Sequence, residues 1–388
     1  MAGSSRRRRR CDVGESLRIA HLTTIDMSLA LLLGTELAVD VAAGHEVFGI
    51  SAPGPYVERV EALGVTHVSL PALTRSWSLR SDVAAARQLA GAVRRLELDV
   101  LHTHTPKAGV MGRVLGRLAR VPVVVNTCHG LWVQEGDSRV KRTVVIGVEG
   151  VASRFSHAEL FQNGNDRAAL RWAVPDRKAQ VVGNGVDLEY FRFDQEGRER
   201  LRAEWGVTAD EVLIGGVGRR VAEKGIVELG AVARALAGRA RFVWVGPADE
   251  DKPDALAADE AGVEFPGPRD DMPAVYSAFD VFVLPSHREG FSRSAMEAAA
   301  CGRPMVLTDI RGCREIGRDG EHVLLVPVRD AVALGAAVAR LLDDSALRER
   351  LGSAAAARAG DAFDQRAVAG ISLATYRRVA ERKGLAWA

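Results

Sequence analysis

Short apolar runs alternate with longer stretches of helical periodicity from one end of this chain to the other. The run Val121–Val125 is apolar without polar alternation, as are strands covered on both faces of a parallel sheet. In the stretches between such runs, apolar residues such as Ile226, Leu229 and Ala233 recur at helical spacings of three and four. The alternation predicts an α/β protein built from two doubly wound, Rossmann-like parallel sheets.

The apolar runs give the expected strands of both halves of the chain. In the first half the predicted strands are Leu17–Leu22, Glu46–Ile50, Thr66–Leu70, Asp99–Thr103, Val121–Thr127, Glu159–Gln162 and Gln180–Val182. In the second half they are Val212–Val217, Arg241–Val245, Val263–Phe265, Val281–Leu284, Pro304–Leu307 and Val323–Val326.

The length of 388 residues is typical of two domains. We place the boundary at Gly183–Asp187, where an Asn-Gly turn follows a predicted strand. This gives an N-terminal domain at 17–183 and a C-terminal domain at 184–363. Residues 364–388 are expected to form a helix that crosses back to the first domain, and residues 1–16 a mobile Arg-rich tail.

Composition excludes several classes of protein. Without the five arginines at 6–10, the net charge of +2 becomes −3, so the folded body is not a basic nucleic-acid binder. The four cysteines form no C-x-x-C pair, which favours reduced thiols in the cytoplasm over a zinc site or a disulfide framework. No apolar run approaches the roughly 18 residues of a membrane span. Asp12 and Glu15 stand where a signal peptide would be apolar.

The strongest motif lies after the predicted strand Val281–Leu284, where a Gly-containing loop leads into a helix that begins near Ser292. In open α/β sheets, ligands bind beyond the carboxyl ends of the strands, and a helix N-terminus attracts anions. Glu289 in the loop and Glu297 in the helix are placed to accept hydrogen bonds from the hydroxyl groups of one elongated ligand. The alternative is that both are solvated carboxylates, but Ala298–Ala300 predict a packed helix in which a stray charge is costly.

These residues resemble the retaining nucleotide-sugar glycosyltransferases of the GT-B fold, in particular the family with a Glu–seven residues–Glu motif. The resemblance extends over nearly the whole chain. Supporting motifs are Gly218–Gly225, Asn184–Asp187 and Thr308–Gly312. Within the family, the segments His104–Gly109 and Cys128–Gly130 are most similar to bacterial enzymes that build saccharides on polyprenyl-diphosphate carriers.

The resemblance implies two domains facing a central cleft and assigns the donor site to the second domain. Arg219 and Lys224 are expected to hold the donor diphosphate, where fixed cations favour the charged transition state. Glu297 is expected to bind the ribose hydroxyl groups and Glu289 the transferred sugar. Further donor-binding residues are expected at Gly218, Phe265, Gly290, Phe291 and Ser292.

In the first domain, the resemblance places His129 against the donor sugar. His102 and His104 end a predicted strand and, with Lys107, are candidates for the acceptor side, although a lone histidine is more often structural. Many relatives carry a Gly-Gly turn after the first strand, whereas this chain has Thr23–Ser28. Ser28, at a helix N-terminus, is the nearest substitute for that phosphate contact.

No metal-ligand spacing is visible in the sequence, so we expect no metal and no cofactor. Retention follows from the resemblance alone, because His21 or Asp26 could also serve as the base that inversion requires. The stretch Lys107–Arg120, with Arg113 and Arg117, predicts either a basic helix on an anionic membrane surface or a solvated arginine face.

The leading hypothesis is a glycosyltransferase that moves a hexosyl or N-acetylhexosaminyl unit from a UDP-sugar to a hydroxyl group. The acceptor is expected to be polyprenyl-linked or a small molecule, and the enzyme cytoplasmic or peripheral on the inner face of the membrane. A nucleotide-sugar epimerase of the same architecture and a non-catalytic membrane or nucleic-acid adaptor are the alternatives.

Overall fold

The computed structural model describes residues 16–133, 137–250, 252–257 and 262–385. The predicted Arg-rich tail therefore lies outside the described residues, apart from Ser16. Contacts divide the chain into two compact units, one reaching from the N-terminal side to Val182 and resuming at Arg366, the other comprising Gly183–Gln365.

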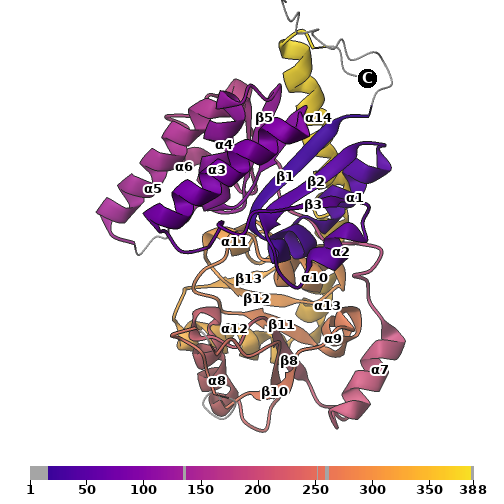
Figure 1. Cartoon of the computed structure of the whole chain (residues 1–388). Coiled ribbons are helices and arrows are strands. Elements are labelled where there is room, and N and C mark those ends of the chain that lie inside the picture. The colour runs from indigo at the N-terminus through magenta and orange to yellow at the C-terminus, as the bar shows by residue number, and fades with distance from the viewer. Residues whose placement is uncertain (1–15, 134–136, 251, 258–261, 386–388) are drawn as a thin grey trace, which may run out of the picture. The chain divides into compact units, whose positions relative to one another are not determined.

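Unit 1 is built on a seven-stranded sheet in the order β3-β2-β1-β4-β5-β6-β7, and all neighbouring strands are parallel (Figure 1). Its strands are β1 (Arg18–Ile25), β2 (Glu46–Ala52), β3 (Thr66–Ser69), β4 (Val100–Thr103), β5 (Val123–Cys128), β6 (Ala158–Phe161) and β7 (Ala179–Val181). The strand order reverses between β1 and β4. Doubly wound sheets bind ligands at the carboxyl ends of the two strands at such a reversal.

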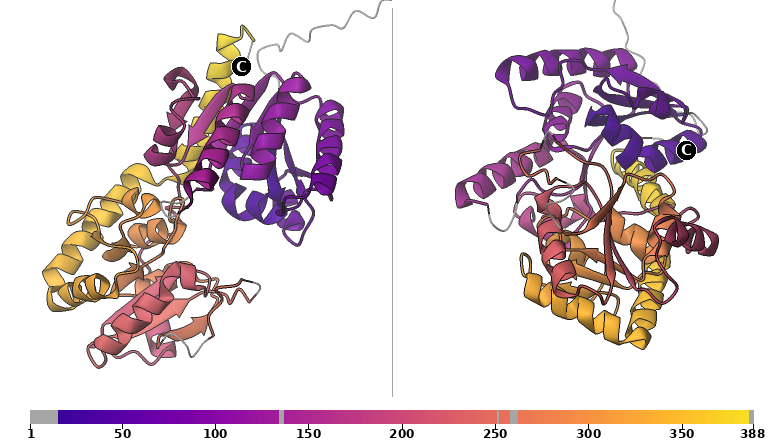
Figure 2. Two further views of the ribbon diagram at one scale, coloured as in Figure 1. Left: turned by 90° about the vertical axis from the view of Figure 1, so that its left-hand side faces the viewer. Right: turned by 90° about the horizontal axis from the view of Figure 1, so that it is seen from below.

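Helices cover both faces of this sheet, which explains its unbroken apolar strands. They are α1 (Gly34–Ala42), α2 (Val57–Glu61), α3 (Leu79–Leu96), α4 (Pro106–Leu118), α5 (Arg139–Ala152), α6 (Gly164–Ala169) and α14 (Gln365–Arg382), with the short turns η1 (Ser28–Leu32), η2 (Ser153–Phe155) and η3 (Asp176–Lys178). Alternate residues of β5 face opposite layers: Val124 packs with α3 and α4, and Val123 and Val125 with α14. The yellow α14 and the purple α3 accordingly lie on opposite sides of the sheet (Figure 2).

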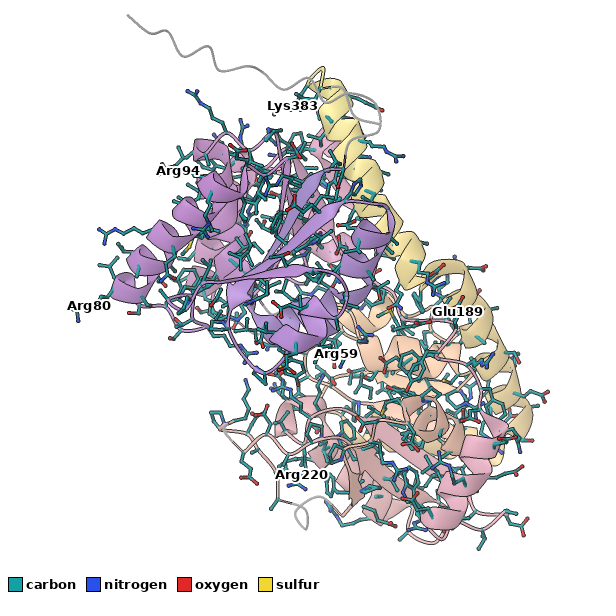
Figure 3. All side chains as sticks on the ribbon, turned by 45° about the vertical axis from the view of Figure 1, so that its right-hand side comes forward. Arg59, Arg80, Arg94, Glu189, Arg220 and Lys383 are labelled. Atoms are coloured by element: carbon teal, nitrogen blue, oxygen red, sulfur yellow. The ribbon has the colours of Figure 1, made fainter. Side chains whose placement is uncertain are left out.

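Helix α14 is the last element of the chain but packs in the core of unit 1. Tyr376 and Ala380 are fully buried, and they share a cluster with Ile19 of β1. Lys383 directly follows the helix (Figure 3). Its ammonium donates to the carbonyl oxygen of Pro122 at 2.5 Å. The final helix thus joins the first and last parts of the sequence within one unit.

Unit 2 is built on a six-stranded parallel sheet in the order β10-β9-β8-β11-β12-β13. Its strands are β8 (Leu213–Val217), β9 (Arg241–Val245), β10 (Glu264–Gly267), β11 (Val281–Leu284), β12 (Met305–Thr308) and β13 (Leu324–Val326). Its helices are α7 (Gln195–Glu204), η4 (Ala222–Lys224), α8 (Ile226–Ala235), α9 (Met272–Ala278), α10 (Arg293–Ala300), α11 (Arg311–Arg314), α12 (Ala331–Asp343) and α13 (Ser345–Ala362). The strand order reverses between β8 and β11.

All thirteen predicted strands are present among the described residues, and the predicted fold of two parallel α/β sheets is confirmed. The largest difference is in β1, which continues to Ile25 instead of ending at Leu22, because its last residue still pairs with Ala52 of β2 after a register shift.

The expected exposed arginine face of α4 is wrong for Arg113. This side chain is buried, and its guanidinium donates to Glu149 at 2.5 Å and to Glu159 at 3.1 Å. Its charge is therefore matched inside unit 1. Arg117 and Arg120 are exposed. Among the described helices, none is both long enough and apolar enough to cross a membrane.

Candidate active site

The loops after β8 and β11 of unit 2 lie side by side, because these strands are neighbours at the reversal of the sheet. Lys224 comes from the first loop and Glu289 from the second. The Lys224 ammonium donates to Glu289 Oε1 at 2.6 Å, and the Ser286 hydroxyl donates to the same oxygen at 2.9 Å. Two residues that are 65 positions apart therefore form one charged pair at the carboxyl edge of the sheet.

Glycines make this close approach possible. Gly225 follows Lys224 with φ +75°, and a Cβ at this position would lie 2.0 Å from the carbonyl oxygen of Pro285. At Gly312 a Cβ would lie 2.6 Å from the carbonyl oxygen of Glu289. Any larger residue at either position would force these loops apart.

Glu297 lies in the first turns of α10 and is 8% exposed. The Tyr276 hydroxyl donates to its Oε2 at 2.6 Å, and Arg293 Nε donates to its Oε1 at 3.0 Å. Burial raises the pKa of Glu297 above its ordinary value, although the Arg293 guanidinium and the Tyr276 hydroxyl act in the opposite direction. A carboxylate held at an energetic cost in this position is typical of a functional site.

Arg219 follows β8 and forms an ion pair with Asp249. The preceding Gly218 accepts a hydrogen bond from Trp244 Nε1 at 2.9 Å through its carbonyl oxygen. Arg220 is labelled in Figure 3. Its guanidinium lies over the ring of Phe265, 5.3 Å from the ring centroid. Arg219 thus lies in the loop after β8, whereas Phe265, another predicted donor-binding residue, lies in β10, on the far side of β9, and is in contact with Arg220.

The residues that open α10 are largely engaged within the protein. The Ser292 hydroxyl accepts from the Ala295 N–H at 3.3 Å and caps the helix, and the Ser292 N–H donates to the carbonyl oxygen of Gly312 at 3.3 Å. The Phe291 ring packs edge-on against Phe363. A donor contact through Ser292 would therefore replace an existing hydrogen bond, and the roles of Gly290, Phe291 and Ser292 stay predictions.

In unit 1 the predicted residues His102, His104 and His129 come together with His21. His21 Nδ1 lies 3.1 Å from His104 Nε2, and His104 Nδ1 lies 3.0 Å from His129 Nε2. At the other end, His21 Nε2 lies 2.7 Å from Asp40 Oδ2. Sequence reasoning had named these histidines one by one; the structure joins them through β1, β4 and the residue after β5.

His102 belongs to a second set of contacts beside this row. Its Nδ1 lies 2.6 Å from the Tyr376 hydroxyl and 3.3 Å from Glu36 Oε1, and its Nε2 lies 2.7 Å from Thr127 Oγ1. The signal that sequence reasoning missed is the pair Glu36 and Asp40, which lie one turn apart on α1 and face the sheet with both carboxylates.

Burial and neighbouring charges shift the pKa values of this cluster in different directions. Burial lowers the pKa of His129 to about 4, and burial with the neighbouring histidines lowers the pKa of His104 well below its ordinary value. Burial also opposes the charge on His21, but the hydrogen bond and charge of Asp40 outweigh it and raise the His21 pKa. Burial would raise the pKa of Glu36, but His102 and His21 lower it to about 2.

Four side chains of unit 1 could also hold a metal ion. His21, Glu36, His102 and His104 each offer one ligand atom, and these atoms lie within 4.8 Å of one another. The spacing of these residues along the chain gives no sign of the group, because it is assembled from α1 and two strands.

The remaining predicted residues of unit 1 have local partners. Lys107 is buried, forms an ion pair with Asp82, and donates to the carbonyl oxygens of Thr74 at 3.0 Å and Ser76 at 2.6 Å. Ser28 opens the short π-helical turn η1 rather than a regular helix. Their predicted contacts with substrate stay predictions.

Comparison with known proteins gives matches over both units. A family model described as glycosyl transferase 4-like domain matches residues 31–185, and one described as glycosyl transferases group 1 matches residues 211–344. The chain is 27% identical to an N,N'-diacetylbacillosaminyl-diphospho-undecaprenol alpha-1,3-N-acetylgalactosaminyltransferase of Campylobacter jejuni, over 86% of this chain and 91% of that protein. It is 31% identical to a D-inositol 3-phosphate glycosyltransferase of Acidothermus cellulolyticus, over 74% of this chain and 68% of that protein.

Solved structures show the same fold. A sucrose-phosphate synthase from Thermosynechococcus elongatus superposes with a TM-score of 0.79 at 22% identity, covering 94% of this chain and all of that one. Anabaena Alr3699/HepE, solved in complex with UDP and glucose, superposes with a TM-score of 0.78 at 21% identity, covering 93% of this chain and all of that one. With its two parallel α/β sheets and these matches, the chain belongs to the glycosyltransferases and has the GT-B fold.

Proposed function

We propose that this glycosyltransferase moves a hexosyl or N-acetylhexosaminyl unit from a UDP-sugar to a hydroxyl group of a polyprenyl-diphosphate-linked saccharide. The observation that carries the proposal is the contact of Lys224 with Glu289, because it brings a cation and a sugar-binding carboxylate to the carboxyl edge of one sheet. Glu297, nearly buried at the start of α10, supplies the second carboxylate. The name of the Campylobacter jejuni relative supports the acceptor class, and the UDP complex of HepE supports the donor class.

In the proposed reaction, the bond between the sugar carbon and the diphosphate oxygen breaks, and the departing UDP gains negative charge. Lys224 and Arg219 stabilise that charge in the transition state because they are fixed before the reaction begins. In the structure each cation forms an ion pair with a carboxylate, Lys224 with Glu289 and Arg219 with Asp249. The diphosphate would replace these carboxylates as the partner of both cations. We propose that the donor site works with these cations in place of a metal, and with retention at the sugar carbon.

Mass spectrometry tests the reaction directly. The enzyme is incubated with a panel of UDP- and GDP-sugars, with and without a polyprenyl-diphosphate disaccharide. We expect the acceptor to gain one hexosyl or N-acetylhexosaminyl mass with a UDP-sugar only. An epimerase would convert the nucleotide sugar without acceptor. Absence of any glycosylated product across the panel would contradict the proposal.

We propose further that unit 1 contacts an anionic membrane surface through α5, where a lipid-linked acceptor is found. Four valines along this helix are exposed: Val140, Val144, Val148 and Val151. Three exposed basic residues, Arg139, Lys141 and Arg142, lie in its first turn. An apolar stripe beside basic residues matches the chemistry of an anionic bilayer, in which the apolar face is buried and cations bind headgroups.

Vesicle sedimentation tests this surface. The Val144→Ser/Val148→Ser variant is expected to lose most binding to phosphatidylglycerol vesicles, while a matched exposed pair on α8 and α12, Val227→Ser/Val332→Ser, keeps it. Binding to vesicles of phosphatidylcholine alone should be weak. Equal binding of both variants would remove α5 from the membrane contact.

A further inference from the structure

Four side chains of unit 1 form a continuous row that we name the histidine chain: Asp40, His21, His104 and His129. Each contact in the row is within hydrogen-bond distance, at 2.7 Å, 3.1 Å and 3.0 Å in that order. His21 and His104 each use both ring nitrogens, one toward each neighbour. The row runs from α1 through β1 and the residue that follows β4 to the residue that follows β5.

When His21 is neutral, as it is at a pH above its pKa, which Asp40 raises, the carboxylate at one end determines where every proton in the row lies. The Asp40 carboxylate can only accept, so the proton of a neutral His21 is on Nε2 and its Nδ1 is bare. The bare Nδ1 of His21 requires His104 to donate from Nε2, which leaves His104 Nδ1 bare. His129 must then donate from Nε2, and its own Nδ1 is left without a proton. Each neutral imidazole has one donor and one acceptor, so the order follows from the first hydrogen bond.

The far end of the row has the environment that this order predicts. His129 Nδ1 is shielded from solvent and has no hydrogen-bond partner among the described residues. A buried N–H without a partner is rarer in proteins than a buried acceptor without one. The bare nitrogen is therefore the less costly state, and it can accept a hydrogen bond from a further donor.

The groups packed around the row leave its order intact. Glu36 of α1 faces His102, and Tyr376 of α14 contacts His102 at 2.6 Å. His102 lies beside His104, with ring centroids 4.2 Å apart, but its nitrogens contact Tyr376, Thr127 and Glu36. The row and the His102 contacts are two separate hydrogen-bond sets.

We propose that Asp40 is a positioning residue for the glycosyl transfer: acting through His21 and His104, it holds His129 in the tautomer whose bare Nδ1 accepts a hydrogen bond from a substrate hydroxyl group. No proton leaves the hydroxyl group in this contact. The substrate part of the inference rests on the proposed function, whereas the tautomer of His129 is a property of the protein alone.

Nitrogen-15 NMR of protein labelled at histidine tests the tautomer without any substrate. Protonated and bare ring nitrogens have well-separated chemical shifts, and loss of signals in His129→Gln assigns that ring. At a pH above the His21 pKa, where that ring is neutral, we expect His129 to be protonated on Nε2 and bare on Nδ1. In Asp40→Leu this preference should be lost, whereas Asp40→Asn, whose amide oxygen can still accept from His21, should keep it. The matched control is Asp99→Leu, because among the described residues the Asp99 carboxylate accepts only from the Arg18 N–H, at 2.9 Å.

Two results of this experiment would overturn the proposal. One is a proton on His129 Nδ1 in the unaltered protein, which decides the matter even if Asp40→Leu fails to fold. The other is bare nitrogen on both facing atoms of His21 and His104 together with a bound metal in elemental analysis, because the contact would then be coordination to one ion rather than a hydrogen bond.

Kinetics test the positioning role once a donor and an acceptor are identified. His129→Ala and Asp40→Leu are each expected to lower kcat/KM about fivefold to tenfold, the effect of one hydrogen bond. The double variant should be no worse than His129→Ala alone, because Asp40 acts only through that ring. Additive losses would show that Asp40 has a merely structural role and would contradict the proposal. If no transfer is found with any substrate, the NMR experiment still tests the tautomer of His129, because it needs no substrate.

Discussion

Replacing Glu297 with glutamine should weaken UDP binding without weakening the fold. The two effects separate because burial raises the pKa of this carboxyl, so the fold holds the charged form at a cost. Glutamine removes that cost, and its amide oxygen still accepts the hydrogen bond from the Tyr276 hydroxyl, which lies 2.6 Å from the carboxylate. Its amide nitrogen cannot accept from Arg293, but the side chain of Arg293 is 45% exposed and can bind water instead. We therefore expect the free energy of unfolding to stay the same or rise by up to about 1 kcal/mol.

The loss in binding follows from the hydrogen bonds to the ribose. A carboxylate that accepts from two hydroxyl groups makes two charge-assisted hydrogen bonds, and a neutral amide makes weaker ones. The difference of about 1–3 kcal/mol corresponds to a roughly 5- to 150-fold weaker affinity for UDP. Isothermal titration calorimetry measures the affinity, and urea denaturation measures the stability. Glu264→Gln, which alters an exposed carboxylate paired with Arg241, is the control and should change neither by much.

Two outcomes would refute this reasoning about Glu297. Unchanged UDP affinity in Glu297→Gln would remove the residue from the nucleotide site. A loss of stability by several kcal/mol, in step with the loss of affinity, would show that the carboxylate holds α10 in place and contacts UDP only indirectly.

Three further predictions concern the same unit and the thiols. Lys224→Met should lower kcat about 100- to 1000-fold, whereas Arg239→Met, which removes an exposed ion pair, should change kcat by no more than a few fold. Equal effects of the two variants on steady-state kinetics would contradict the role of Lys224 at the donor diphosphate. Gly225→Ala should reduce the free energy of unfolding, measured by urea titration, by about 2 kcal/mol or more, because the new Cβ would lie 2.0 Å from a carbonyl oxygen. The control Gly335→Ala, in α12, should change the free energy of unfolding by no more than about 1 kcal/mol. Burial raises the pKa of Cys301 to about 12 and that of Cys313 above the ordinary value, whereas Cys128 is only partly buried. In a Cys11→Ser/Cys128→Ser variant neither remaining thiol should therefore react with Ellman's reagent at pH 8 before unfolding. Rapid labelling of that native variant would show that these thiols are not buried.

The strands could be predicted from the sequence because parallel strands covered on both faces are continuous apolar runs. Val123 to Val125 illustrate the reason: every side chain of this stretch is fully buried, against α14 on one side and against α3 and α4 on the other. The apolar run itself therefore predicts the strand. Where a strand ends depends on its pairing with a neighbouring strand, as the longer β1 shows, and the apolar run alone does not give that end.

Contacts between distant side chains could not be predicted in the same way. Arg113 has the spacing of an exposed basic residue, and its burial depends on Glu149 and Glu159, which lie 36 and 46 positions later. In the sequence, Lys107 likewise has no evident partner. In the structure its ammonium donates to two carbonyl oxygens of the segment before α3. Charge alone does not reveal where a partner will lie.

The candidate residues of the two units differ in the same respect. Lys224 and Glu289 belong to motifs that directly follow two strands, so the sequence predicts both as site residues. Because β8 and β11 are neighbours in the sheet, the Lys224 ammonium lies 2.6 Å from Glu289 Oε1. Asp40, in contrast, lies in an ordinary amphipathic helix with no motif. Only the packing of α1 on the sheet shows that it ends a row of histidines.

A crystal structure of the protein with bound UDP tests the central claim most directly. The account predicts that the diphosphate contacts the Lys224 ammonium in place of Glu289, and that Glu297 accepts hydrogen bonds from the ribose hydroxyl groups. A nucleotide bound at any place other than the carboxyl ends of β8 and β11 would contradict it.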